Sequence, residues 1–317
     1  MSAVRFTSAF AAPLEQYLEF KSQMGFYGQS RIVYLRRFDS YATRHDLRVF
    51  DRAAIEGWVT EELARSSVHR SWMSYIRDFG RWLALHVDPD AYVLSDQWKA
   101  PFIRTQPYLL AQEEIDRFFT AAAGICAQSP WAWQAGAFFT LMHSCGLRTG
   151  EVRALAVSQV DLAGGRLDIV GSKGRRSRRL PITDEVTAVL TECDQQSRTR
   201  FPHRENFFVS AAGTPVAPAS VGVIFHRIWD AAGLPAPEHG KRARPYDFRH
   251  HFAYANLERW MAGGTDVTAM LPYLARYMGH ATFDSTYYYV HTSPDFMNSY
   301  ADIAQEGQSL LPEVGFE

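Results

Sequence analysis

Hydrophobic residues recur at helical spacing through roughly the first hundred positions of the chain. The clearest pattern marks one face of a single helix through Val68, Trp72, Tyr75, Ile76, Phe79, Trp82 and Leu83. Three shorter patterns precede it, beginning at Pro13, around Tyr34 and after Asp51, whose side chain suits a helix N-cap. The pattern therefore predicts a small all-α domain of four helices, with its aromatic residues in the core.

The periodicity then stops between residues 96 and 108, which contain Pro101 and Pro107. Proline disfavours helix at its own position and at the one before it, so this stretch is predicted to be an interdomain linker. Helical spacing resumes afterwards at 115–122 and 131–145, and Gly146 is placed to end the second of these helices.

Alternating hydrophobic and polar residues predict a β-hairpin further along the chain. Its strands cover 166–170 and 179–182, and Gly-Ser-Lys-Gly at 171–174 forms the turn. Thr183 is predicted to cap the helix that follows, because a threonine hydroxyl can accept from the first backbone N–H groups. Further helices are predicted at 219–232 and 249–261.

Composition narrows the class of protein. With 317 residues, 47% hydrophobic and 21% charged, the chain has the length for about two globular domains and is not a long disordered polymer. It shows no apolar run of membrane-spanning length and no secretory signal, so no membrane partner is expected. Three cysteines without C-x-x-C spacing favour reduced thiols and a cytoplasmic location over a disulfide framework or zinc cluster.

The formal net charge of −1 conceals two basic segments, 166–180 and 238–251. Clusters of this kind can neutralise the phosphates of nucleic acid, although solvated surface runs look the same. The candidate DNA-contacting residues within them are Arg175, Arg176, Arg178, Arg179, Lys241, Arg242 and Arg244.

Four separated motifs carry candidate chemistry: Gly-Leu-Arg-Thr-Gly-Glu at 146–151, the hairpin lysine, Tyr-Asp-Phe-Arg-His at 246–250, and Met-Gly-His at 278–280 followed by a tyrosine triplet. Their principal residues are Arg148, Lys173, Arg249, His280 and Tyr289. Arg148 lies at a junction between two helices, and Glu151, one turn later, can orient it.

These residue types suit phosphodiester chemistry without a metal. Arginines can bind nonbridging oxygens, a lysine can protonate a leaving oxygen, and a tyrosine can form a covalent intermediate. The chain shows no cluster of carboxylates of the kind a two-metal nuclease uses. Taken singly, each motif is typical of a surface ion pair, a turn, a helix end or packing, so their order and spacing carry the argument.

The ordered motifs resemble those of the tyrosine recombinases, the phage-integrase type of site-specific recombinase. The match covers roughly residues 105–295 by motif, and the N-terminal helices fit the family by architecture. The resemblance implies a mainly α fold with a small β-sheet, arranged as a C-shaped clamp. Its expected parts are a core-binding (SAM-like) helical domain at 1–95, the linker at 96–108, a mixed α+β catalytic domain at 109–295 and a C-terminal interaction segment at 296–317.

The resemblance also implies the reaction, which is site-specific DNA recombination in integration, excision or transposition. Arg148, Arg249 and His280 would hold the scissile phosphate while Tyr289 attacks it, with Lys173 as general acid. The 3′-phosphotyrosyl intermediate would lead to a Holliday junction, with no cofactor and no metal.

The implied partner is double-stranded DNA, bound by a homo-tetramer on two recombination sites. Without DNA the protein would be a monomer or dimer. An accessory protein or partner recombinase stays open.

One position departs from the family pattern. Tyr246 stands three residues before Arg249, where the family usually has histidine. A phenol with a pKa near 10 can donate a hydrogen bond to phosphate but is a poor proton shuttle, and His250 is a candidate to support it. Among the three adjacent tyrosines, Tyr289 has the expected spacing from His280, and neighbours on a helix point about 100° apart.

Two alternatives remain at the level of sequence. A recombinase-like protein that has lost catalysis would bind DNA without forming an adduct. A type IB topoisomerase-like relaxase would share the chemistry but act without a preferred site, and the separate helical N-terminal domain favours the recombinase.

Overall fold

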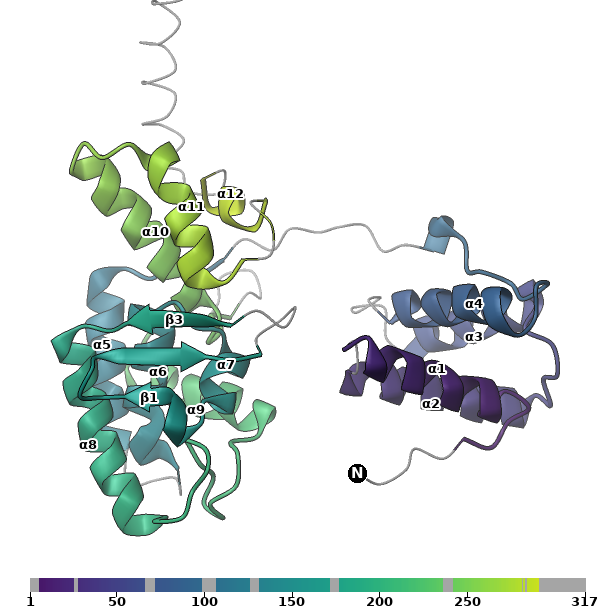
Figure 1. The fold of residues 1–317 in the computed structure, drawn as a ribbon, viewed down its shortest axis with the longest axis horizontal. Coiled ribbons are helices and arrows are strands. Elements are labelled where there is room, and N and C mark those ends of the chain that lie inside the picture. Colours follow the sequence, from purple (N-terminus) through teal and green to yellow (C-terminus); the bar gives the residue numbers. More distant parts are fainter. Residues whose placement is uncertain are drawn as a thin grey trace, which may run out of the picture. The chain divides into compact units, whose positions relative to one another are not determined.

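The computed structural model describes residues 6–25, 28–65, 72–98, 107–125, 131–171, 177–235, 242–280, 282 and 284–290. The chain divides into two compact units, Met1–Arg104 and Thr105–Glu317 (Figure 1). In the predicted linker, Asp96–Trp98 forms the short 3-10 helix η1, and residues 99–106 lie outside the described part.

The first unit contains four described α-helices: α1 (Ala11–Gln23), α2 (Gln29–Arg44), α3 (Arg52–Arg65) and α4 (Met73–His86). They occur where the periodicity predicts them, although Val68 lies outside the described residues. Asp51 caps α3, since its Oδ1 accepts from the N–H of Ala54 at 2.8 Å. Phe38, Trp58 and Phe79 are buried in the core, as expected for the aromatic positions.

The second unit is mixed. Its α-helices are α5 (Gln112–Gly124), α6 (Ala135–Ser144), α7 (Thr149–Ala154), α8 (Asp184–Arg200), α9 (Pro218–Ala231), α10 (Asp247–Ala262), α11 (Val267–Met278) and α12 (Asp284–Val290). Two short 3-10 helices are η3 (Ala132–Gln134) and η4 (Val157–Gln159). The strands β1 (Val160–Asp161), β2 (Arg166–Ile169) and β3 (Arg178–Pro181) form an antiparallel sheet in the order β1-β2-β3. The mainly α fold with a small sheet is confirmed.

Strand β1 and helix α11 of the second unit were not predicted. Strand β1 is two residues long, which is too short for alternation to be recognised. Helix α11 contains Pro272, which argues against a helix in sequence, yet Asp266 caps its start by accepting from Thr268 N at 2.8 Å. The helix ends at Gly279, whose φ of +68° lies in the left-handed region.

Two hydrophobic cores meet along α10. Near its start, Phe248 packs against Phe118 with a ring separation of 5.0 Å, within the main core of the second unit. Further along, Tyr254 belongs to a smaller cluster that also holds Leu274 of α11 and Tyr289 of α12. Figure 1 shows these three helices gathered at one end of the unit, beyond the sheet. Arg249, one residue after Phe248, is thereby fixed between the two cores.

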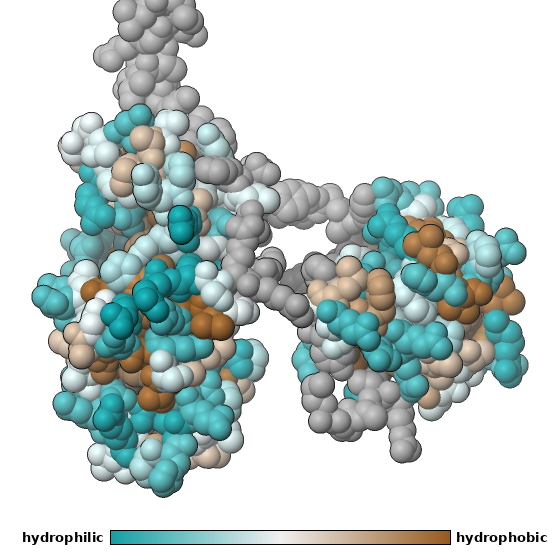
Figure 2. Space-filling model, in the orientation of Figure 1, coloured by the Kyte–Doolittle hydropathy of each residue, from teal (hydrophilic) through white to brown (hydrophobic). Residues whose placement is uncertain are grey.

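The exposed side of the sheet is polar. Hydrophilic residues gather over the strands in the view of Figure 2. Asp168 of β2 and Arg179 of β3 form a cross-strand ion pair at 2.7 Å. Within the described residues, no helix combines the length and hydrophobicity needed to cross a membrane.

Candidate active site

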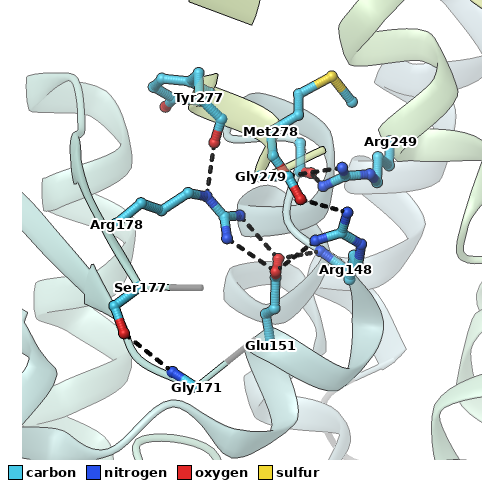
Figure 3. A network of polar contacts seen from close by, with 10 residues as sticks. Arg148, Glu151, Gly171, Ser177, Arg178, Arg249, Tyr277, Met278 and Gly279 are labelled. Atoms are coloured by element: carbon cyan, nitrogen blue, oxygen red, sulfur yellow. Dashed lines mark hydrogen bonds and ion pairs between the residues drawn. The ribbon is translucent and has the colours of Figure 1, made fainter. Parts of the chain in front are cut away.

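Arg148 precedes the first turn of α7, where Glu151 holds it in two ways. Glu151 Oε1 lies 2.8 Å from Nη1 of Arg148, and Oε2 accepts from the backbone N–H of Arg148 at 2.9 Å. The one-turn spacing of the two residues accounts for this contact. The other terminal nitrogen of Arg148 donates to the carbonyl of Gly279 at 2.8 Å, so the first and last motifs meet here (Figure 3).

Arg249 lies in the first turn of α10 and is fully buried. Its terminal nitrogens donate to the carbonyls of Gly146 and Met278, the latter at 2.8 Å. Its Nε is buried and has no hydrogen-bond partner among the described residues. Burial and the charge of Arg148 both lower the pKa of Arg249. The site therefore holds a guanidinium that two backbone carbonyls orient, and its Nε has no acceptor among the described residues.

His280 follows the left-handed Gly279 and is buried. Its Nδ1 lies 2.7 Å from the hydroxyl of Thr286, and its ring stacks on Tyr289 with centroids 6.0 Å apart. Burial, followed by the charges of Arg249, Arg148 and Arg178, lowers the pKa of His280 to about 3, against a smaller opposing effect of Glu151. The imidazole is therefore neutral at pH 7.

The contact between His280 and Thr286 was not found from sequence. Thr286 is fully buried on α12, three residues before Tyr289. Residues three apart share a helix face, so the face that carries the tyrosine also carries this hydroxyl. The three-residue spacing between Thr286 and Tyr289 is the feature of the sequence that could have predicted a shared face.

Tyr289 is the most enclosed of the three adjacent tyrosines, with 2% of its surface exposed. Its ring lies 5.5 Å from those of Tyr254 and His250. Burial raises the pKa of Tyr289 above its ordinary value, while the positive charge of Arg249 acts in the opposite direction. Tyr287, by contrast, is 42% exposed.

Tyr246 lies at the rim of this group. It is about a third exposed, and its ring makes an edge contact with His250 at 5.0 Å. Burial lowers the pKa of His250 to about 4, and its Nδ1 is buried without a hydrogen-bond partner in the described part of the chain. A series of ring contacts thus runs from Tyr246 through His250 to Tyr289.

Arg178 differs from its predicted place as a DNA contact. Its side chain is only 9% exposed, its two terminal nitrogens each donate to an oxygen of Glu151 at 2.9 Å, and Nε donates to the carbonyl of Tyr277 at 2.7 Å. Strand alternation explains the correction, since Arg178 pairs with Ile169 on the face of the hairpin that buries apolar side chains. A basic run that looks uniform in sequence alternates between inside and outside in the strand.

The other predicted DNA contacts that the structure describes are exposed and paired with carboxylates. Arg179 pairs with Asp168 at 2.7 Å, Arg242 with Asp230 at 2.6 Å and Arg244 with Asp247 at 3.1 Å. Outside the described residues lie Lys173, Arg175, Arg176, Lys241 and the segment 296–317.

Comparison with known sequences defines the family. The Phage integrase family model matches residues 109–295, more than half of the chain, so the protein belongs to this family. A putative integrase/recombinase of Sinorhizobium fredii is 29% identical over 304 residues, covering 92% of this chain and 94% of that protein. Tyrosine recombinase XerD of Bifidobacterium longum is 29% identical over 243 residues, covering 74% of this chain and 73% of its own length. The protein is thus a tyrosine recombinase, and its activity is site-specific DNA recombination.

Solved structures show the same fold at low sequence identity. The XerH site-specific recombinase bound to difH substrate aligns with a TM-score of 0.61 and 18% identity, covering 94% of this chain and 85% of that one. The Tn1549 transposon integrase in complex with transposon right end DNA aligns with a TM-score of 0.62 and 13% identity, covering 94% of this chain and all of that one.

Proposed function

We propose that the protein recombines double-stranded DNA at a specific site through a covalent bond between Tyr289 and the 3′ phosphate. Arg148 and Arg249 bind the nonbridging oxygens of the scissile phosphate and neutralise the charge that develops during attack. The phenolic oxygen of Tyr289 gives up its proton to water and bonds to phosphorus as the bond to the 5′ oxygen breaks. Lys173 supplies the proton that the leaving 5′ oxygen takes up.

His280 acts in this scheme as a neutral hydrogen-bond donor. The scheme assigns the hydroxyl of Thr286 as the donor to Nδ1, 2.7 Å away, so that the ring proton is on Nε2 and Nε2 donates to a phosphate oxygen. The lowered pKa of His280 supports this assignment, because a neutral ring keeps one defined donor throughout the neutral pH range.

The observation that carries the proposal is the place of Tyr289. It is buried against the His280 ring, and the guanidinium of Arg249 acts on its pKa, whereas Tyr287 is exposed. This burial supports Tyr289 over Tyr287 as the nucleophile, in addition to its spacing from His280.

The free 5′ hydroxyl of a partner strand would then attack the phosphotyrosyl bond and restore Tyr289. Two rounds of exchange would pass through a Holliday junction, made by a homo-tetramer on two sites. One neighbouring structure is of a lambda integrase tetramer bound to a Holliday junction, which supports this assembly.

A suicide substrate tests the proposal. A cognate DNA site nicked near the cleavage position traps the covalent complex, which denaturing gel electrophoresis detects as an adduct resistant to SDS. Wild-type protein is expected to form the adduct and Tyr289→Phe to form none, while Tyr287→Phe, the matched neighbour, keeps it. An adduct that survives in Tyr289→Phe would transfer the role to another tyrosine, and specific binding without any adduct would favour a DNA-binding protein that has lost catalysis.

A further inference from the structure

One carboxylate at the centre of the site is shared by two arginines. Oε1 of Glu151 accepts from Nη1 of Arg148 at 2.8 Å and from Nη1 of Arg178 at 2.9 Å. Oε2 accepts from the backbone N–H of Arg148 and from Nη2 of Arg178, both at 2.9 Å. These four bonds use the acceptor capacity of a carboxylate, so Glu151 is fully committed inside the protein (Figure 3).

The group formed by Glu151 and the three arginines around it has more positive than negative charges. Arg148, Arg178 and Arg249 are positive and Glu151 is negative, so the group carries a net positive charge of two. With Arg148 as its only partner, Glu151 would cancel the charge that Arg148 offers to a phosphate. Arg178 offsets Glu151 instead, which leaves the charges of Arg148 and Arg249 for the ligand. The pKa of His280 responds to these charges, since all three arginines lower it and Glu151 raises it.

Two features of the backbone at the end of α11 fix the position of the Arg178 guanidinium: the carbonyl of Tyr277 and the absence of a side chain at Gly279. Its Nε donates to the carbonyl of Tyr277 at 2.7 Å, which joins β3 to the last turn of α11. A β-carbon at Gly279 would lie 2.7 Å from Nη1 of Arg178, so the guanidinium fills the space that a side chain would take there. Arg178 therefore joins three of the motifs: the arginine turn, the hairpin strand and the glycine before His280.

We propose that Arg178 is a positioning residue, which neutralises and holds Glu151 so that the charge of Arg148 remains available to the scissile phosphate. The inference rests on the proposed function of the site. It makes Arg178 part of the recombination machinery without contact to DNA, which separates it from the exposed Arg179 beside it.

The test is a double-mutant cycle on single-turnover cleavage of the suicide substrate. The variants are Arg178→Gln, Arg178→Lys, Glu151→Gln and the double variant. Arg204→Gln is the matched control, because Arg204 is also a buried arginine that shares a carboxylate, Asp194, and its contacts with Asp194 and the ring of Phe207 lie outside the proposed site. Each protein is compared at a temperature where circular dichroism shows it to be folded.

Arg178→Gln is expected to slow adduct formation about 100-fold, the size seen when one preorganised electrostatic group is lost, with affinity for the site changed less than threefold. Arg178→Lys, which keeps the charge but loses the two-pronged contact, is expected to fall between this variant and wild type. The double variant is expected to lose less than the product of the two single losses, because both act through one pair.

A second readout needs no DNA. NMR titration of the His280 ring is expected to show a higher pKa in Arg178→Gln, because one positive charge has gone, and an unchanged pKa in Arg204→Gln. Equal cleavage by Arg178→Gln and Arg204→Gln, or strictly multiplicative losses in the cycle, would overturn the inference. Failure of wild type to form any adduct would refute the proposed function instead, and the two failures are therefore distinct.

Discussion

Two carboxylates in the second unit are each paired with two arginines, and they differ in what surrounds them. Asp194 pairs with Arg198, one turn further along α8, and with Arg204 in the following loop. Glu151 pairs with Arg148 three residues before it and with Arg178 on a strand 27 residues away. Arg198 is 70% exposed, whereas Arg178 is 9% exposed.

The comparison shows how similar ion groups acquire different roles. The Asp194 group ties a helix to its own following loop, which is a local, structural task. The arginines around Glu151 also donate to carbonyls at the end of α11, next to the motif that holds His280. The group therefore joins separate elements at the point where the phosphate is proposed to bind.

Loss of the carboxylate is expected to have the largest effect. Glu151→Gln leaves two shielded arginines without their counter-charge, which is expected to lower the free energy of unfolding by about 3 kcal/mol. Asp194→Asn is expected to cost less, since it leaves one buried arginine, Arg204, without its counter-charge, whereas Arg198 lies mostly in water. Urea unfolding of both variants measures the difference, and equal losses would mean that the two groups are equivalent.

Substitution at the glycine beside Arg178 comes next. Gly279→Ala places a side chain at a φ of +68° and drives it into the guanidinium, with an expected cost of about 1–2 kcal/mol from the backbone alone. Gly136→Ala on α6 is the control, because nothing lies within 4 Å of its would-be β-carbon and alanine favours helix by up to about 1 kcal/mol. Thermal unfolding should shift in opposite directions for the two variants.

Acid is expected to lower the folding stability through protonation of His280, which lies beside the Glu151 group. The unfolded pKa of histidine is near 6.5 and that of folded His280 is about 3, so the unfolded chain binds more protons between these values. The contribution of the neutral His280 to the free energy of unfolding is therefore fully present above pH 6.5, and it is lost as the pH falls toward 3. His280→Gln is expected to reduce the proton uptake on unfolding at pH 5 by about one, and an unchanged pH slope would contradict the buried, neutral assignment.

Exposed arginines should matter least to stability. Arg179→Gln and Arg198→Gln are each expected to change the free energy of unfolding by under about 0.5 kcal/mol. The two variants should differ in how their affinity for DNA depends on salt. If Arg179 contacts a phosphate, Arg179→Gln reduces the slope of log affinity against log salt concentration by about one. Arg198→Gln is expected to leave that slope unchanged. Identical slopes would remove Arg179 from the predicted DNA contacts.

Sequence patterns predicted the elements that have local signals. Asp51 and Thr183 cap helices as expected, and the hairpin follows its alternation. Helix α11 was missed because Pro272 lies inside it, where packing of Leu271 and Leu274 outweighs the local penalty.

The candidate site divides in the same way. Arg148 and Glu151 are close in sequence, so their contact could be inferred from spacing. Strand alternation and helix spacing give the faces that carry Arg178 and Thr286, but the sequence pattern does not say which distant element each face meets.

Besides the carboxylate of Glu151, four main-chain oxygen atoms orient the three arginines of the site, those of Gly146, Tyr277, Met278 and Gly279. Every amino acid supplies such an oxygen, so the direction of each guanidinium depends on the path of the chain. For protein engineering, this separates two tasks. A library that varies residues 277 and 278 changes how the end of α11 packs, yet keeps the main-chain acceptors that orient the arginines.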